Sequence, residues 1–284
     1  MTTQEAVNRL KSELAGLYPA GEADAIIRVI FEDVLNYSPV DMVLRHDHPL
    51  PEFFDARLDE IIRRLNGHEP IQYVLGTARF HGHKLHVTRD VLIPRPETEQ
   101  LVDLVVDSAD GRDDLRVVDA CTGSGCIAVS LARALRFARV SAFDISAPAL
   151  DVAARNADAL GVKVNFFRAD LLAPRLPEVG EIDILVSNPP YVTQGERAAM
   201  EPQVLLFEPL DALFVPDADP MRFYRPLAEM GKRSLAPGGA VFLEINRAMG
   251  PQVKALLASC GYEDIRILRD SFGNDRFAAA NQPK

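Results

Sequence analysis

The strongest constraint on the fold is a regular alternation of strand-like and helix-like segments that begins near residue 115. Apolar runs typical of buried strands occupy residues 115–119, 139–144, 162–168 and 183–188, and helical segments follow the first two. Such alternation is typical of α/β folds in which helices cover a parallel sheet. Each run ends in a polar or glycine-rich element, and the carboxyl ends of parallel strands meet at one edge of the sheet. The pattern therefore predicts an α/β domain with a ligand site along that edge.

The first strand end carries a glycine-rich turn, Ala120-Cys-Thr-Gly-Ser-Gly125, which leads into a helix. A strand, a glycine-rich turn and a helix form the cofactor-binding unit of Rossmann-like folds, because glycines let the backbone approach the ligand. The glycine spacing is shorter than Gly-x-Gly-x-x-Gly, and the Lys-Ser/Thr pair of a phosphate loop is missing. The turn therefore predicts a cofactor site without identifying the cofactor.

The second and third strand ends each carry an acid. Asp144 lies about 20 residues after the glycine turn, where a carboxylate can accept hydrogen bonds from ribose hydroxyls. Asp170 follows the third strand and is suited to accept a hydrogen bond from the amino group of adenine. Both acids have a structural alternative. Asp144 can cap the helix that starts near Ser146, and Asp170 can be a simple turn residue.

The fourth strand runs into Asn188-Pro-Pro-Tyr191. The prolines lack backbone donors and stop the strand, so Asn188 falls at its carboxyl end. A rigid loop can aim the Asn188 side-chain oxygen and the Pro189 carbonyl at one point, which suits a planar –NH2 group. Tyr191 can then stack on the flat face of that group. The alternative is a strand followed by a proline-rich turn that has no chemical role.

The chain before residue 94 has a different pattern. Apolar residues recur at helical spacing, which predicts an N-terminal helical domain over residues 1–76. An alternating stretch around Gly82 predicts a β-hairpin within a linking segment, 77–93. The remaining residues, 94–284, then form the catalytic domain.

The segment Leu92-Ile-Pro-Arg-Pro-Glu-Thr-Glu99 leads into an amphipathic helix. Arg95 stands between two prolines, which hold it in an extended segment as a fixed cation. Such a cation can contact the substrate, or it can form a salt bridge that links the two domains. The sequence leaves both interpretations open.

Length and composition restrict the classes of function. The 284 residues are enough for two domains, and the net charge of -10 argues against a protein that binds nucleic acid phosphates. Three cysteines without Cys-x-x-Cys spacing, together with His46 and His48 that lack a third ligand, predict neither a disulfide framework nor a metal site. Because the N-terminus lacks a signal peptide and no apolar run reaches membrane-spanning length, we expect a cytoplasmic protein.

Taken together, the motifs resemble those of class I S-adenosylmethionine-dependent methyltransferases. More narrowly, the chain is similar to the PrmC/HemK family, which methylates the glutamine of peptide-chain release factors. The resemblance covers nearly the whole chain and rests on six motifs: Leu92-Ile-Pro-Arg-Pro-Glu-Thr-Glu99, Thr122-Gly-Ser-Gly125, Asn188-Pro-Pro-Tyr191, Glu208-Pro-Leu-Asp-Ala-Leu213, Phe223-Tyr224 and Gly273-Asn-Asp-Arg276. Amino-group methyltransferases of DNA adenine share Asn-Pro-Pro-Tyr, so the combination with the first motif indicates this family.

The resemblance implies a seven-stranded sheet whose last strand is antiparallel, a helical domain that docks the release factor, and S-adenosylmethionine as the cofactor. It implies cofactor binding by Cys121, Thr122, Gly123, Ser124, Gly125, Asp144, Asp170, Leu171 and Asn188. It implies substrate binding by Asn188, Pro189, Pro190, Tyr191 and Arg95, with Asn188, Pro189 and Tyr191 as the catalytic residues. We expect a monomer that binds neither DNA nor membranes.

The chain departs from the family pattern at three places. Cys121 and Leu171 stand where the family usually has a glycine and often has a bulky aromatic residue, and the stretch Leu213-Phe-Val-Pro-Asp-Ala-Asp-Pro220 replaces a commonly glycine-rich loop. Three other functions compete. They are glutamine methylation of a ribosomal protein, adenine methylation in nucleic acid, and nicotinamide-dependent oxidation on the same Rossmann-like half. The last leaves Asn188-Pro-Pro-Tyr191 unexplained.

Overall fold

The computed structural model describes residues 1–283, which form two compact units. The smaller unit consists of Met1–Gly76 together with Glu201–Phe207, and the larger one of Thr77–Met200 and the chain from Glu208 onward. Within residues 1–283, every helix falls short of the length and apolarity that crossing a bilayer requires. Each unit has its own core, so we describe them separately.

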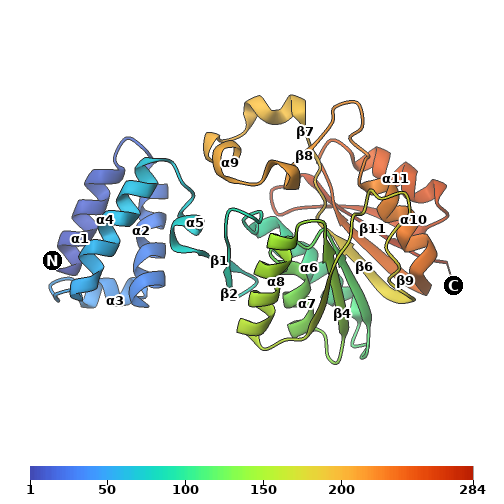
Figure 1. Cartoon of the computed structure of the whole chain (residues 1–284), viewed down its shortest axis with the longest axis horizontal. Helices are drawn as coiled ribbons and strands as arrows, with labels where there is room; N and C mark the ends of the chain where they lie inside the picture. Colours follow the sequence, from blue (N-terminus) through green and yellow to red (C-terminus); the bar gives the residue numbers. More distant parts are fainter. Residues whose placement is uncertain (284) are drawn as a thin grey trace. The chain divides into compact units, whose positions relative to one another are not determined.

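The smaller unit is helical, as the sequence predicts (Figure 1). Its helices are α1 (Thr3–Leu14), α2 (Ala20–Leu35), α3 (Pro39–Leu44), α4 (Glu52–Asn66), α5 (Ile71–Leu75) and α9 (Pro202–Phe207). Helix α4 buries Phe54, Leu58, Ile61, Ile62 and Leu65, a spacing that places them on one face toward the core. Helix α3, in contrast, has no buried residue.

The larger unit is built on a seven-stranded sheet with the order β10-β11-β9-β6-β3-β4-β5. The strands are β3 (Arg116–Ala120), β4 (Arg139–Asp144), β5 (Val164–Arg168), β6 (Ile182–Ser187), β9 (Leu235–Glu244), β10 (Glu263–Arg269) and β11 (Asp275–Asn281). Strands β3, β4, β5, β6 and β9 are parallel, whereas β11 is antiparallel to both of its neighbours. The predicted sheet with an antiparallel last strand is confirmed.

Helices cover both faces of this sheet (Figure 1). Because side chains alternate along a strand, neighbouring residues such as Val117 and Val118 enter opposite cores. One core contains α6 (Pro96–Ala109), α7 (Cys126–Ala134) and part of α8 (Ala147–Leu160); the other contains α10 (Tyr224–Ser234) and α11 (Gly250–Ser259). Burial on both faces explains why these strands are continuous apolar runs.

The hairpin β1 (Thr77–Phe80) and β2 (His83–His86) belongs to the larger unit. Its apolar side chains Phe80 and Leu85 are buried in the core that contains α6 and α7. Asn156 of α8 accepts a hydrogen bond from the His86 backbone nitrogen at 2.6 Å and donates to its carbonyl at 3.0 Å. The hairpin is therefore packed into the larger unit.

The order of the strands places the ligand edge. From β3 the chain adds β4 and β5 on one side, and it then returns to add β6 and β9 on the other. Such a reversal opens a crevice beyond the carboxyl ends of the two central strands, β3 and β6. The glycine-rich turn follows β3, and Asn188 follows β6.

Candidate cofactor and substrate site

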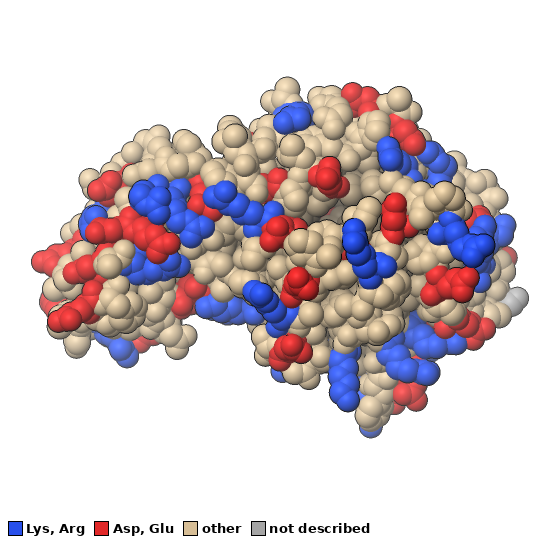
Figure 2. All heavy atoms as spheres, viewed as in Figure 1, with Lys and Arg blue, Asp and Glu red and all other residues tan. Residues whose placement is uncertain are grey.

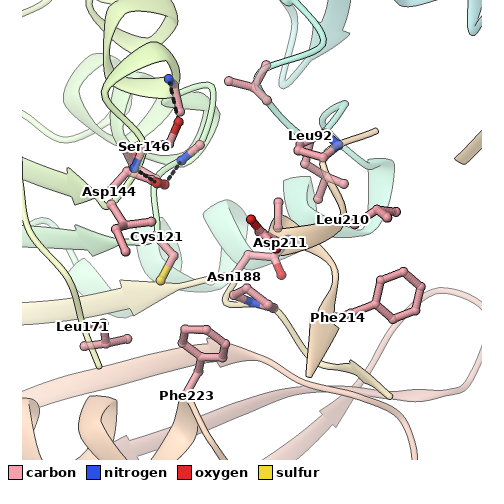
Figure 3. A pocket seen from close by; sticks show the side chains of 18 of the residues that line it. Leu92, Cys121, Asp144, Ser146, Leu171, Asn188, Leu210, Asp211, Phe214 and Phe223 are labelled. Carbon is pink, nitrogen blue, oxygen red and sulfur yellow. Dashed lines mark hydrogen bonds between the residues drawn. The ribbon is translucent and has the colours of Figure 1, made fainter. Parts of the chain in front are cut away.

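A cavity of about 990 Å³ lies in the larger unit at this edge of the sheet (Figure 3). Its walls come from the ends of β3, β4, β5 and β6, from the Ile-Pro-Arg-Pro segment, and from the stretch between Pro209 and Phe223. The cavity brings together nearly all of the residues predicted from the sequence: Arg95, Cys121, Thr122, Gly123, Ser124, Asp144, Asp170, Leu171, Asn188 and Pro190. Gly125, Pro189 and Tyr191 do not line it.

The glycine-rich turn explains the first departure from the family pattern. Cys121, Gly123 and Gly125 all have positive φ values, of 59°, 53° and 78°. A left-handed conformation costs a residue with a Cβ about 1–2 kcal/mol relative to glycine, which is a physical reason for a usual glycine at position 121. Burial raises the pKa of the Cys121 thiol, so this cavity-lining sulfur is neutral at physiological pH.

Asp144 lines the cavity at the end of β4, and its side chain accepts hydrogen bonds from two backbone nitrogens. Its Oδ2 accepts a hydrogen bond from the Gly123 backbone nitrogen at 2.9 Å, and its Oδ1 accepts one from Ser146 at 3.0 Å (Figure 3). The N-cap of α8 is Ser146 itself, whose side chain accepts from Ala149. Each carboxylate oxygen has a second lone pair, so Asp144 can also accept two ligand hydroxyl groups.

Asp170 and Leu171 follow β5 on the same side of the cavity. The Oδ1 of Asp170 accepts a hydrogen bond from the Leu172 backbone nitrogen at 2.8 Å, as in a turn, and its side chain stays exposed. Leu171 is buried at the cavity wall. An acid beside an apolar side chain is suited to the polar edge and flat face of an adenine ring.

Asn188 lies in the middle of the cavity in the view of Figure 3, between the cluster of Asp144, Cys121 and Leu171 and the residues on the far side. Its Nδ2 donates a hydrogen bond to Thr98 Oγ1 at 3.2 Å. The side-chain oxygen therefore remains available to a ligand. The role of this oxygen as the acceptor for a planar –NH2 group stays a prediction.

Tyr191 is held away from the cavity. Its hydroxyl donates to Glu244 Oε1 at 2.9 Å, and its backbone carbonyl accepts from Asn246 Nδ2 at 3.2 Å. Pro189 is buried and is also missing from the cavity wall. The stacking of Tyr191 on the substrate and the acceptor role of the Pro189 carbonyl stay predictions, and the geometry gives Tyr191 an anchoring role as well.

Arg95 forms an ion pair with Glu208, with 2.6 Å between Nη2 and Oε1. Glu208 is buried, and its other oxygen accepts from the Ile93 backbone nitrogen at 3.2 Å. Both partners belong to the larger unit, so this salt bridge does not link the two domains. It joins two of the motifs that carry the family resemblance, and Arg95 still lines the cavity.

The unusual stretch from Leu213 to Pro220 forms part of the far side. Its strand β8 (Phe214–Val215) pairs in parallel with β7 (Val192–Thr193), which follows Asn-Pro-Pro-Tyr directly. Two short helices complete this side, η1 (Gln194–Ala199) and η2 (Leu210–Ala212). Phe214 lines the cavity below the guanidinium of Arg197, whose Cζ lies 5.6 Å from the ring centroid.

The chain is similar to known proteins over nearly its whole length. Two family models match: the PrmC N-terminal domain over residues 5–76 and the methyltransferase small domain over residues 98–208. A release factor glutamine methyltransferase from Bacteroides thetaiotaomicron is 43% identical over 273 residues, which cover 96% of this chain and 98% of that protein. The chain therefore belongs to the release factor glutamine methyltransferase family. A second member, from Flavobacterium psychrophilum, is 36% identical and covers 94% of this chain and 95% of its own.

Two solved methyltransferase structures share the fold. The chain matches a 16S rRNA methyltransferase from Thermus thermophilus with a TM-score of 0.52 and 18% identity, over 72% of this chain and 49% of that one. It matches a methyltransferase from Pyrococcus furiosus with a TM-score of 0.51 and 16% identity, over 70% of this chain and 89% of that one. The larger unit therefore has the class I methyltransferase fold.

Three residues at the site were not assigned a role from the sequence. Thr98, Glu244 and Asn246 all bond to the Asn188-Pro-Pro-Tyr191 loop or to each other. Glu244 ends strand β9 as Asp144 ends β4, so an acid that closes an apolar run is the sequence signal for both, and Thr98 stands within the Pro-Arg-Pro-Glu-Thr-Glu motif. Among residues 1–283, no group of three or more His, Cys, Asp or Glu side chains is arranged to hold a metal ion.

A buried acid lies behind the glycine-rich turn. Asp119 lies near the end of β3 with a fully buried side chain; Oδ2 accepts from Thr122 Oγ1 at 2.6 Å, whereas Oδ1 has no hydrogen-bond partner within residues 1–283. Burial raises the pKa of this carboxyl to about 7, and the hydrogen bond from Thr122 opposes the shift only in part. A carboxyl that gives up most of its hydration favours its neutral form.

We expect Asp119 to make stability depend on pH. Between the unfolded pKa of about 3.9 and the folded value of about 7, the native state keeps a proton that the unfolded state has lost. The free energy of unfolding therefore falls as the pH rises across this window, by an amount on the order of 4 kcal/mol. Asp119→Asn keeps an acceptor for Thr122 and removes the titration.

Urea unfolding of both proteins at several pH values between about 4.5 and 8 measures the effect, with circular dichroism as the probe. The stability advantage of the Asn variant should grow as the pH rises. Other titrating groups are common to the two proteins and cancel in the difference. A difference that stays constant with pH would mean that Asp119 ionises normally in the folded state.

Proposed function

We propose that this chain transfers a methyl group from S-adenosylmethionine to the side-chain amide nitrogen of the glutamine in the Gly-Gly-Gln motif of peptide-chain release factors. The observation that carries the proposal is the position of Asn188 in the cavity. Its side-chain oxygen is available to a substrate –NH2 group, and the cofactor-type turn lies on the same edge of the sheet. Membership in the family supplies the substrate class.

The residues of the cavity fit the cofactor. Asp144 can hold the ribose hydroxyls, Asp170 and Leu171 the adenine ring, and the turn from Cys121 to Ser124 the methionine portion. When bound, S-adenosylmethionine supplies a methyl group on a positively charged sulfur, which is reactive without an activated protein nucleophile. The protein therefore has to position the acceptor and exclude competing water.

The acceptor nitrogen is the difficult partner, because its lone pair is delocalised into the amide carbonyl. Hydrogen bonds from –NH2 to the Asn188 side-chain oxygen and to the Pro189 carbonyl hold the nitrogen in line with the methyl group. Both acceptors also stabilise the positive charge that develops on nitrogen during transfer. The methylated nitrogen then loses one proton to water, and the mechanism needs no general base.

Replacing Asp144 by alanine is expected to weaken cofactor binding by about ten- to a hundredfold, because a hydrogen bond to a charged group contributes about 1.5–3 kcal/mol. Isothermal titration calorimetry with S-adenosylmethionine measures the change. Asp144→Ala also removes the acceptors of the Gly123 and Ser146 backbone nitrogens, so the variant must first be shown to be folded. If Asp144→Ala binds cofactor as tightly as the wild type, the ribose role is wrong.

The alternative acceptors give different expectations. For adenine in nucleic acid, the net charge of -10 is unfavourable, and on the face shown in Figure 2 basic side chains are interspersed with acidic ones. For a nicotinamide-dependent oxidoreductase, the Asn-Pro-Pro-Tyr loop has no function. A thermal shift with S-adenosylmethionine but not with a nicotinamide dinucleotide separates the two cofactor classes.

Mass spectrometry tests the substrate. The purified protein is incubated with S-adenosylmethionine carrying a labelled methyl group and with a recombinant release factor, a ribosomal protein fraction or an adenine-containing oligonucleotide in parallel. We expect label on the Gly-Gly-Gln glutamine of the release factor, and no label when that glutamine is replaced by glutamate. Label on the ribosomal protein or on adenine alone would overturn the proposal.

We further propose that the smaller unit contacts the release factor outside the glutamine motif. Supporting this, the family model named for the PrmC N-terminal domain matches residues 5–76. Helix α3 and the start of α4 also expose large apolar side chains, namely Val40, Val43, Leu44 and Phe53. If kcat/KM is measured by the same incorporation of labelled methyl groups, its value for the whole release factor should exceed its value for a short Gly-Gly-Gln peptide, because remote contacts position the glutamine.

A further inference from the structure

We propose that Thr98 and Glu244 are positioning residues that fix the orientation of the Asn188 side-chain amide, so that its oxygen rather than its nitrogen faces the substrate. This inference rests on the proposed function. Thr98 lines the cavity and Glu244 does not, and the proposed function assigns neither residue a contact with cofactor or substrate. They act through Asn188.

The three side chains form one continuous hydrogen-bond chain. Asn188 Nδ2 donates to Thr98 Oγ1 at 3.2 Å, and the Thr98 hydroxyl donates to Glu244 Oε2 at 2.8 Å. Thr98 and Glu244 are buried, with 2% and 1% of their surfaces exposed. They come from the first turn of α6 and the end of β9, so two rigid elements hold the chain in place.

The carboxylate gives the chain its direction. Both oxygens of Glu244 are acceptors: Oε2 receives a hydrogen bond from the Thr98 hydroxyl and Oε1 receives one from the Tyr191 hydroxyl. The Thr98 hydroxyl must therefore point its hydrogen at Glu244, which leaves only lone pairs of its oxygen for Asn188. Only the nitrogen end of the Asn188 amide can satisfy them.

An arginine belongs to the same cluster as Glu244. Burial raises the pKa of the Glu244 carboxyl, and the two hydroxyl hydrogen bonds and the nearby Arg276 guanidinium oppose that shift. Arg276 Nη1 donates to the Tyr191 hydroxyl at 3.4 Å, and its Nε donates to Asp270 Oδ2 at 3.2 Å. Arg276 ends the Gly-Asn-Asp-Arg motif, whose place near the site the sequence alone does not explain. The cluster therefore joins the α6 motif, the Asn-Pro-Pro-Tyr loop and the Gly-Asn-Asp-Arg motif.

Orientation matters because an amide group has nearly the same shape after a half turn about χ2. A flipped Asn188 would present its own –NH2 to the substrate –NH2, placing two donors against each other. Packing alone cannot prevent such a flip, since oxygen and –NH2 differ little in size. The Thr98 hydroxyl can prevent the flip, because its hydrogen is directed at Glu244 and its oxygen can only accept from Asn188.

The test compares Thr98→Val with Thr98→Ser in the full-length protein. Valine keeps the shape of threonine and removes the hydroxyl, whereas serine keeps the hydroxyl. We expect Thr98→Val to lower kcat on the release factor about tenfold, the effect of one hydrogen bond left unmade. Thr98→Ser keeps the hydroxyl, so its kcat should stay close to that of the wild type. Affinity for S-adenosylmethionine, measured by calorimetry, should be unchanged in both variants.

A double substitution separates positioning from general damage. If Thr98 acts through Asn188, Thr98→Val should cause no further loss of kcat when it is added to Asn188→Ala. Glu244→Gln is a second variant for the case that Thr98→Val does not fold. A glutamine amide facing Thr98 can reverse the polarity of the chain, so kcat should fall here too, again only when Asn188 is present.

Two results would overturn the inference. One is a Thr98→Val protein with wild-type kcat. The other is a loss of kcat of the same size with and without Asn188, which indicates general damage to the fold. Both comparisons of kcat require a wild-type enzyme that has already been shown to methylate the release factor. If the wild type itself leaves the glutamine unmethylated, the proposed function fails instead, so the two failures are distinguishable.

Discussion

Replacing Asn188 by alanine is expected to lower kcat for release factor methylation about a hundred- to a thousandfold, the range measured when one charge-stabilising hydrogen-bond partner is removed from an active site. The side-chain oxygen of Asn188 is proposed to contact the substrate nitrogen as positive charge develops on it. Its loss therefore belongs mainly in kcat. Single-turnover kinetics with labelled S-adenosylmethionine measure the chemical step directly.

Cofactor binding provides the control for this prediction. The cofactor residues Asp144, Asp170 and Leu171 come from the ends of other strands, so Asn188→Ala should keep cofactor affinity within a few-fold of the wild type. Asn188→Asp is the matched variant, because it retains an oxygen acceptor but cannot donate to Thr98. It should lie between the wild type and Asn188→Ala. A normal kcat in Asn188→Ala would remove Asn188 from the reaction.

The sheet and its ligand edge could be predicted because they depend on local patterns. Strand β4 has the predicted bounds, and β3 and β6 differ from prediction by one residue at each end, because apolar runs between glycines, prolines and acids identify buried strands. Strand β9 is harder to predict, because it begins at Leu235 and includes Pro237-Gly-Gly239, a combination of residues that is typical of turns.

The pairing of side chains around the loop could not be predicted from local patterns. Glu244 lies 146 residues from Thr98 and 53 residues from Tyr191, and Glu208 lies 113 residues from Arg95. Their meeting depends on the strand order, which places β9 beside β6. For the same reason, the sequence does not predict that the Tyr191 hydroxyl bonds to the buried acid Glu244. The stacking of the Tyr191 ring on the substrate stays a prediction.

The second large effect is expected at Gly125, which does not line the cavity but controls how closely the glycine-rich turn approaches α8. A Cβ at this position would lie 2.9 Å from the Cβ and 3.1 Å from the Cα of Ala153, closer than carbon atoms pack. Gly125 also has a φ of 78°. Gly125→Ala should therefore cost about 1–2 kcal/mol in backbone strain and about 1–3 kcal/mol in overpacking.

Gly161→Ala is the matched control, because it carries the strain without the clash. Gly161 ends the same helix and has a φ of 64°. A methyl group at this position would meet no heavy atom within 4 Å apart from those of its chain neighbours. Urea unfolding should show a clearly larger loss of stability for Gly125→Ala than for Gly161→Ala. Equal losses would mean that α8 moves away from the turn at little cost.

The cofactor affinity of Gly125→Ala decides whether this close contact also serves function. Asn156 of α8 donates to the Ser124 carbonyl at 2.9 Å and binds the His86 backbone, so the helix, the turn and the hairpin are held together at one point. If α8 is pushed away, this contact is broken and Ser124 and Gly123 are displaced at the cavity wall. Gly125→Ala should then bind S-adenosylmethionine more weakly even where it is still folded, whereas Gly161→Ala should bind it normally.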